Sequence, residues 1–241
     1  VCGCALAIEA LFLEAGYSEG VLRALLIEVD RVESVIQHDA VQGVALTGSE
    51  RAGAAVAAIA GRAIKKTVLE LGGSDPYLIC EDADLDLAAA KCVQSRLNNC
   101  GQTCISAKRL LVHAAVLESF TQKLVAEIAK RRMGDPEDER TNLGPMSRGD
   151  LRANLQRQVD ASVAAGAHCV LGGNVPEGPG LFYPPTVLTQ VRPGMPAFDE
   201  EVFGPVVAII AVQDDADAID LANQSAYGLG AAVFTADIVR A

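Results

Sequence analysis

Helical and strand-like patterns of apolar and polar positions alternate along this chain. We predict helices, the first of them amphipathic, over 4–15, 50–62, 85–99, 115–132, 150–165 and 215–224. Short apolar runs between turn residues predict strands over 21–27, 41–47, 65–71, 76–80, 109–113, 168–171, 182–188, 205–212 and 229–235. Short strands that alternate with helices are typical of βαβ units around a mostly parallel sheet. The pattern therefore predicts an α/β fold.

Cap and turn residues indicate where some of these elements begin and end. Asp82 or Asp84 is a candidate N-cap for the helix that follows them. The double glycine Gly72-Gly73 comes directly after a predicted buried strand, and flexible turn chemistry there indicates a domain boundary. We therefore predict two domains, residues 1–70 and residues 71–241.

Composition and charge exclude several classes of protein. Half of the 241 residues are hydrophobic and only 4% are aromatic, which suits thin, Ala-rich helices packed on buried strands. The net charge of −11 argues against a nucleic-acid partner, because nucleic-acid binders carry a basic patch. The sequence contains no apolar stretch long enough to span a bilayer and no signal-peptide pattern. We expect neither nucleic acid nor membrane as a partner.

The cysteine count and the chain ends bear on compartment and completeness. An odd number of cysteines, seven, argues against a disulfide framework and for a reducing, cytoplasmic compartment. The chain begins at Val1 instead of Met, and it ends just after Asp237 begins a predicted helix. We interpret both ends as internal to a longer protein.

Cys104 is the candidate nucleophile among the seven cysteines. It follows the turn Gly101-Gln102, which lets a thiol face a cleft. The spacings of Cys2 to Cys4 and of Cys100 to Cys104 do not match zinc patterns. The histidines occur in no metal or hydrolase motif, so we predict no metal site and no Ser-His-Asp triad; they are His38, His113 and His168.

Two glutamates and one strand-to-helix turn complete the candidate chemistry. Glu70 ends a predicted buried strand, where burial could raise its pKa and fit it to act as a general base. Glu201 precedes Phe203-Gly204-Pro205, which by itself also fits a structural turn. The turn from Gly48 to Gly53 opens a helix, and it fits either a pyrophosphate site or an ordinary helix start capped by Ser49.

These blocks occur in an order that resembles one enzyme family. Asn99-x-Gly101-Gln102-x-Cys104, with Glu70 upstream and Glu201 downstream, resembles the core of the NAD(P)-dependent aldehyde dehydrogenase superfamily. Two further segments resemble its succinate-semialdehyde dehydrogenase branch, namely 71–76 and 144–146. The resemblance implies that 1–70 is the latter part of a Rossmann-type cofactor domain. It implies that 71–241 is an α/β catalytic domain that lacks its C-terminal end and oligomerisation strand.

The resemblance also implies roles for individual residues. Cys104 would be the thiol nucleophile, Glu70 the base that activates water, and Asn99 the residue that shapes the nucleophile loop. NAD or NADP would be the cofactor, and its binding residues would be Gly48, Ser49, Gly53, Leu71, Glu201 and Phe203. Glu201 would bind the nicotinamide ribose. A homodimer or homotetramer would be the state of the full-length protein.

The expected reaction is oxidation of an aldehyde, succinate semialdehyde first, to a carboxylic acid. One departure from the branch concerns Asn98, which stands where many succinic semialdehyde dehydrogenases have an Arg for the substrate carboxylate. Arg96 is the nearest cation, and two residues along a helix turn it away from that position. A dehydrogenase for a less acidic aldehyde, an acyl transferase or reductase, and a catalytically silent relative remain alternatives. Glu70 argues against acyl transfer.

Overall fold

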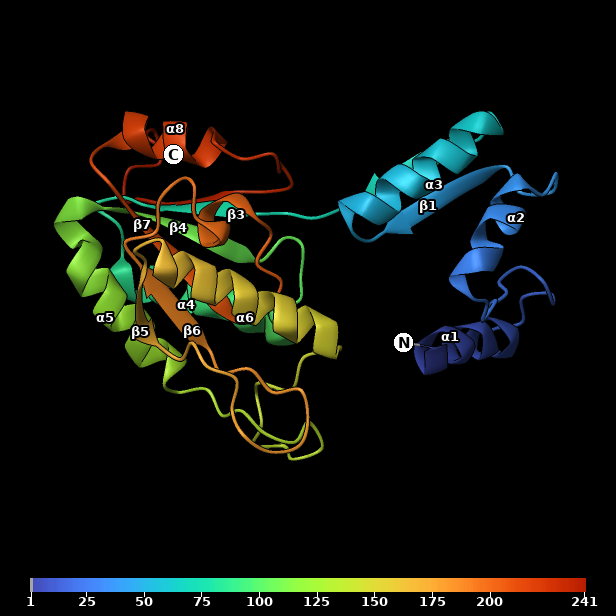
Figure 1. Cartoon of the computed structure of the whole chain (residues 1–241), viewed down its shortest axis with the longest axis horizontal. Helices are drawn as coiled ribbons and strands as arrows, with labels where there is room; N and C mark the ends of the chain where they lie inside the picture. Colours follow the sequence, from blue (N-terminus) through green and yellow to red (C-terminus); the bar gives the residue numbers. More distant parts are fainter. Residues whose placement is uncertain (1) are drawn as a thin grey trace. The chain divides into compact units, whose positions relative to one another are not determined.

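The computed structural model describes residues 2–241 (Figure 1). These residues form two compact units, which we call unit 1, ending at Leu71, and unit 2, Gly72–Ala241. The division lies at the double glycine. The assignment of the units as cofactor and catalytic domains remains a prediction.

Unit 1 is a small α/β unit around two parallel strands. Its elements are α1 (Cys2–Glu14), η1 (Val29–Arg31), α2 (Val32–Gln37), β1 (Gly43–Thr47), α3 (Glu50–Arg62) and β2 (Lys66–Glu70). Strand β1 pairs with β2 from Gly43 opposite Lys66 to Thr47 opposite Glu70. A small apolar cluster centred on Ile36, Val56 and Ala60 joins α2, α3 and β1.

Two predictions for unit 1 are wrong. Residues 21–27 form no strand, because no neighbouring strand within the described chain pairs with them, and most of their side chains are exposed. The first helix is present, but it is not amphipathic: its apolar residues occur on all sides, and none of its side chains is buried. The prediction of a helix here is confirmed, but the prediction of an amphipathic one is wrong.

Unit 2 contains the larger core. Its strands are β3 (Asp75–Ile79), β4 (Ala107–His113), β5 (His168–Leu171), β6 (Thr186–Thr189), β7 (Val206–Val212) and β8 (Ala232–Phe234). Its helices are α4 (Leu85–Leu97), η2 (Asn98–Gly101), η3 (Ala114–Val116), α5 (Leu117–Ile128), α6 (Gly149–Ala164), α7 (Pro196–Asp199) and α8 (Asp215–Asn223). The sequence pattern did not predict the short helices α2 and α7, since elements of four to six residues span fewer than two helical turns and show no repeat of the helical period.

The sheet of unit 2 is mostly parallel, as the alternating pattern predicted. Its six strands lie in the order β5-β6-β7-β4-β3-β8, and only β5 runs antiparallel to its neighbour. Strand β4 lies between β3 and β7 and is buried from Ala107 to Val112. Helices α4 and α5 pack together and against this part of the sheet (Figure 1). The chain after α4 therefore returns to the sheet through the segment that contains Cys104.

The start of α4 is set by its cap. Asp84 is the N-cap, as one of the two predicted candidates, and its Oδ1 accepts hydrogen bonds from the N–H groups of Asp86 and Leu87 at 3.1 and 3.0 Å. Among the described residues we find no helix with the length and apolar character that a membrane crossing requires.

Candidate active site

The segment after α4 holds an unusual backbone conformation. Asn99, Cys100 and Gly101 have φ values of 49°, 56° and 72°, so three consecutive residues lie in the left-handed region. Such φ values cost about 1–2 kcal/mol for a residue other than glycine. Asn99 adapts to the turn by hydrogen bonding, because its Nδ2 donates to the Gln102 carbonyl at 3.1 Å and Gln102 Nε2 donates to the Asn99 carbonyl at 3.1 Å. The strain lies at the start of the nucleophile loop, residues 98–106.

Gly101 lets this loop pack on the segment around Gly204. A Cβ atom at Gly101 would overlap the Gly204 carbonyl group and lie 2.8 Å from the Pro205 nitrogen. Both obstacles are backbone atoms, so no side-chain rotation relieves the overlap. The Gly-Gln and Phe-Gly-Pro motifs, about a hundred residues apart in sequence, are thus two halves of one close backbone contact.

We therefore expect Gly101→Ala to destabilise the complete protein, meaning residues 1–241 with any sequence that adjoins them. The combined left-handed strain and overlap should lower the free energy of unfolding by about 2–5 kcal/mol. Gly228→Ala is the matched control, because Gly228 has open space around it and no positive φ. Urea unfolding curves measure both variants, and equal curves would contradict the close packing of Gly101.

Cys104 differs from its neighbouring cysteines in exposure. Burial raises the pKa of the Cys92 thiol to about 12 and that of the Cys100 thiol to about 11, which leaves both protonated and inert at neutral pH. Cys104 is half-buried in the turn that precedes β4. Its backbone N–H donates to no acceptor within residues 2–241. A thiol and a spare N–H on the same residue suit attack on a carbonyl group followed by oxyanion stabilisation.

Glu201 lies against the double glycine within unit 2. Its Oε1 accepts a hydrogen bond from the Gly73 N–H at 3.0 Å, and a Cβ at Gly72 would lie 2.8 Å from its Oε2. A Cβ at Gly73 would overlap the Cys104 carbonyl oxygen. The structure therefore brings Glu201, the double glycine and the nucleophile loop together, and it places half-buried Phe203 two residues beyond Glu201.

Sequence reasoning missed the buried cations around this loop. Arg96 is fully buried on α4, and its guanidinium donates to the carbonyls of Gly101, Val202 and Gly204. Asn98 is not among its hydrogen-bond partners within residues 2–241. Lys108 on β4 is 2% exposed and reaches the loop carbonyls. The cations at the start of the buried strand 107–112 were a signal for Lys108, whereas the polar run around Arg96 offered none. Only tertiary contacts identify the acceptors of either cation.

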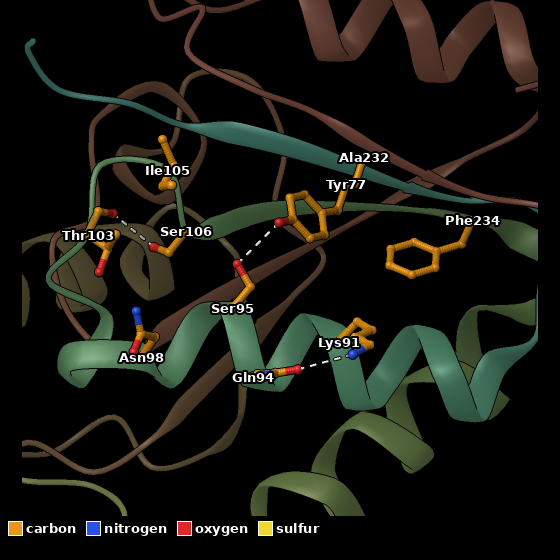
Figure 2. Close-up of a pocket in the computed structure, with 10 residues that line it drawn as sticks. All are labelled: Tyr77, Lys91, Gln94, Ser95, Asn98, Thr103, Ile105, Ser106, Ala232 and Phe234. Atoms are coloured by element: carbon orange, nitrogen blue, oxygen red, sulfur yellow. Dashed lines mark hydrogen bonds between the residues drawn. The ribbon is translucent and has the colours of Figure 1, made fainter.

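A cavity lies beside the same loop (Figure 2). Asn98 and Thr103 are at one end of it and Lys91 and Phe234 at the other, while Tyr77 bonds Ser95 across it at 3.2 Å. Cys104 is not among the residues that line it. The cavity is therefore lined by residues of the nucleophile loop on both sides of Cys104, but not by Cys104 itself.

In unit 1, the predicted cofactor residues occupy the start of α3. Ser49 is the N-cap, and its Oγ accepts from the Ala52 N–H at 3.3 Å. Gly53 permits close packing, because a Cβ there would lie 2.6 Å from a methyl group of Leu71. Gly48 has only ordinary contacts around it, so close approach does not explain this glycine within the described residues. The exposed first turn of the helix offers N–H groups to an anion.

The surroundings of Glu70 differ from the prediction. Strand β2 is exposed along most of its length, and Glu70 is exposed at its end. The reason is that β2 pairs with β1 alone in a two-stranded sheet. Residues 2–241 therefore do not supply the burial that we expected around this carboxylate. The same residues contain no cluster of three or more His, Cys, Asp or Glu side chains able to hold a metal ion.

Comparisons with known proteins agree with the motifs. The model of the aldehyde dehydrogenase family matches residues 1–241. The succinate semialdehyde dehydrogenase [NAD(P)+] Sad of Escherichia coli is 48% identical over all of this chain and 52% of its own length. The succinate-semialdehyde dehydrogenase [NADP(+)] of Deinococcus radiodurans is 49% identical over 98% of this chain and 50% of its own. The chain thus spans about half the length of these curated relatives.

A solved structure shows the same similarity in three dimensions. The succinic semialdehyde dehydrogenase from Streptococcus pyogenes, in complex with NADP+, is 40% identical with a TM-score of 0.93, over 97% of this chain and 51% of its own. The match of the family model along the whole sequence, the α/β fold and the grouping of the Cys104, Glu201 and double-glycine motifs lead to one conclusion. This chain belongs to the aldehyde dehydrogenase family.

Proposed function

We propose that the complete protein oxidises succinate semialdehyde to succinate with NAD or NADP. The observation that carries the proposal is the nucleophile loop, where a half-exposed thiol and a spare backbone N–H occur on Cys104. The names of the relatives from Escherichia coli and Deinococcus radiodurans support the substrate. Family resemblance supports a homodimer or homotetramer.

The residues that would hold the cofactor fit its chemistry. The exposed N-terminus of α3, with Ser49 and Gly48 before it and Gly53 packed on Leu71, suits the diphosphate. The Glu201 carboxylate, already oriented by the Gly73 N–H, suits the hydroxyls of the nicotinamide ribose. Phe203 would pack near the nicotinamide. When bound, NAD(P)+ supplies the acceptor for the hydride.

The chain's own residues account for the covalent chemistry. The Cys104 thiolate attacks the aldehyde carbon, and the Cys104 N–H stabilises the oxyanion that forms. Loss of the hydride leaves a thioester on Cys104. Glu70 takes a proton from water, the resulting hydroxide attacks the thioester, and succinate is released with the free thiol. Asn99 keeps the loop in shape through its bonds with Gln102.

Substrate and cofactor are tested together by measuring NAD(P)H formation in the complete protein. Succinate semialdehyde is compared with an uncharged aldehyde of similar length, with each cofactor. We expect succinate semialdehyde to be oxidised with the higher kcat/KM. A preference for the uncharged aldehyde would make Asn98 the mark of a different substrate class. Product release to coenzyme A instead of water would indicate an acyl transferase, and no reaction with any aldehyde would indicate a silent relative.

A further inference from the structure

Lys108 is a buried lysine with three backbone acceptors. Its Nζ lies 3.0 Å from the Thr103 carbonyl oxygen, 2.7 Å from that of Cys104 and 3.4 Å from that of Ser106. An ammonium group has three N–H donors and no acceptor, so these three carbonyls match its full hydrogen-bonding capacity. All three belong to the nucleophile loop.

This arrangement is costly for the fold. Within residues 2–241, Lys108 forms no ion pair with a carboxylate, and its partners are neutral carbonyls. Burying an ammonium without a counter-ion carries a desolvation penalty, which a methionine of similar length would avoid. A charge kept at such a cost next to the nucleophile calls for a role beyond filling space.

The Thr103 carbonyl is the point where the buried polar groups converge. Besides Lys108, it accepts from the Ser106 Oγ at 3.0 Å and from the Ser106 N–H at 3.3 Å. Arg96 Nη1 in turn donates to the Ser106 Oγ at 3.0 Å. Two buried cations thus act on one carbonyl, Lys108 directly and Arg96 through a hydroxyl group.

That carbonyl belongs to the same peptide as the Cys104 N–H. The described chain contains no cis peptide bond, so the Thr103 C=O and the Cys104 N–H point in opposite directions from one plane. Holding the oxygen on the Lys108 side directs the N–H away from the core. Hydrogen bonds to the oxygen also polarise the peptide, which makes its N–H a stronger donor.

We propose that Lys108 is a positioning residue for the oxyanion hole, because its ammonium orients and polarises the Thr103–Cys104 peptide whose N–H stabilises the oxyanion. The inference rests on the proposed function, since an oxyanion forms only if Cys104 attacks an aldehyde. It predicts that the protonated form of Lys108 supports hydride transfer better than the neutral form.

The charge of Lys108 changes in an accessible pH range. Burial lowers the pKa of Lys108 to about 8, and the nearby Arg96 adds to the decrease, while Glu201, Asp75 and Cys104 oppose it. Lys108 is therefore charged at pH 7 and neutral at pH 10. A substitution at position 108 leaves Arg96, Glu201, Asp75 and Cys104 in place, so the ratio of the two rate constants reports the effect of position 108.

The experiment compares the complete wild-type protein with Lys108→Met at saturating cofactor. Stopped-flow absorbance measures the rate constant of the first-turnover NAD(P)H burst from pH 7 to pH 10, and an aldehyde deuterated at C1 verifies that hydride transfer limits it. We expect the variant to be about tenfold to a hundredfold slower at pH 7, less than for loss of a direct donor. The ratio of the two rate constants should approach one near pH 10.

The outcomes separate this inference from its alternatives. A ratio near one at pH 7, or a large ratio that does not change with pH, overturns the role of the Lys108 charge. Ser106→Ala should slow the burst less than Lys108→Met does, and the burst rate of Ser106→Ala should depend on pH between 7 and 10 as that of the wild type does. Loss of this pH dependence in Ser106→Ala would also overturn the role of the Lys108 charge. A wild-type protein that forms NAD(P)H with a flat ratio overturns only this inference, whereas a wild-type protein that forms no NAD(P)H with any aldehyde overturns the proposed function and this inference with it.

If Lys108→Met does not fold, the pH dependence of the wild-type burst rate still tests the proposal. Loss of the Lys108 proton as the pH rises makes the burst slower, because the Thr103–Cys104 peptide loses its cationic hydrogen-bond donor. A fall in the wild-type burst rate as the pH rises through about 8 supports the proposal. A rate that only rises or levels off up to pH 10 overturns it.

Discussion

Cys104→Ala should abolish aldehyde-dependent NAD(P)H formation in the complete protein. The thiolate is the only group in the proposed mechanism that forms a bond to the aldehyde carbon, and without that bond the hydride has no tetrahedral intermediate to leave. We expect a loss of turnover on the order of 10⁴-fold or more, as for other nucleophile substitutions. Steady-state absorbance measures the loss, and cofactor titration shows whether binding is retained.

Cys100→Ala is the matched control for that experiment. Cys100 lies in the same loop, but its thiol is buried, and burial raises its pKa to about 11. Its substitution should leave most of the turnover, with a modest loss of stability for a small cavity. Retained activity in Cys104→Ala, or abolished activity in a folded Cys100→Ala, would show that Cys104 is not the nucleophile.

Glu70→Gln should separate the two halves of the reaction. Glutamine keeps the shape of the side chain but does not accept a proton from water, so the hydride burst should persist while hydrolysis of the thioester slows. We expect steady-state turnover to fall by about 10²–10⁴-fold, the usual contribution of a general base. Stopped-flow absorbance should show a burst close to one NAD(P)H per thiol, followed by a slow phase.

Glu28→Gln is the control for Glu70, because Glu28 is another exposed glutamate of unit 1 and caps no helix with its side chain. It should behave as the wild type. Unchanged steady-state turnover in Glu70→Gln would place the base elsewhere. Loss of the burst would show that Glu70 acts before the thioester forms.

Local sequence was sufficient for most elements and for the family. The predicted helix 50–62 has the same bounds as α3, and Asp84 and Ser49 cap the helices they precede, because caps and helical periods depend on neighbours within one or two turns. The motif around Cys104 indicated the family before any contact was known. The segment 21–27 was wrong because an apolar run becomes a strand only where another strand pairs with it.

The tertiary structure alone decided how the candidate site is held together. Gly73 meets Glu201 across 128 positions of sequence, and Arg96 meets Val202 across 106, so neither contact is readable from local spacing. The burial of Lys108 beneath the Cys104 peptide depends on how β4 returns beside the loop. The exposure of Glu70 depends on what covers β2. Sequence by itself determined which chemical groups this protein has, whereas long-range packing determined which of them meet, because burial and hydrogen-bond partners come from distant segments.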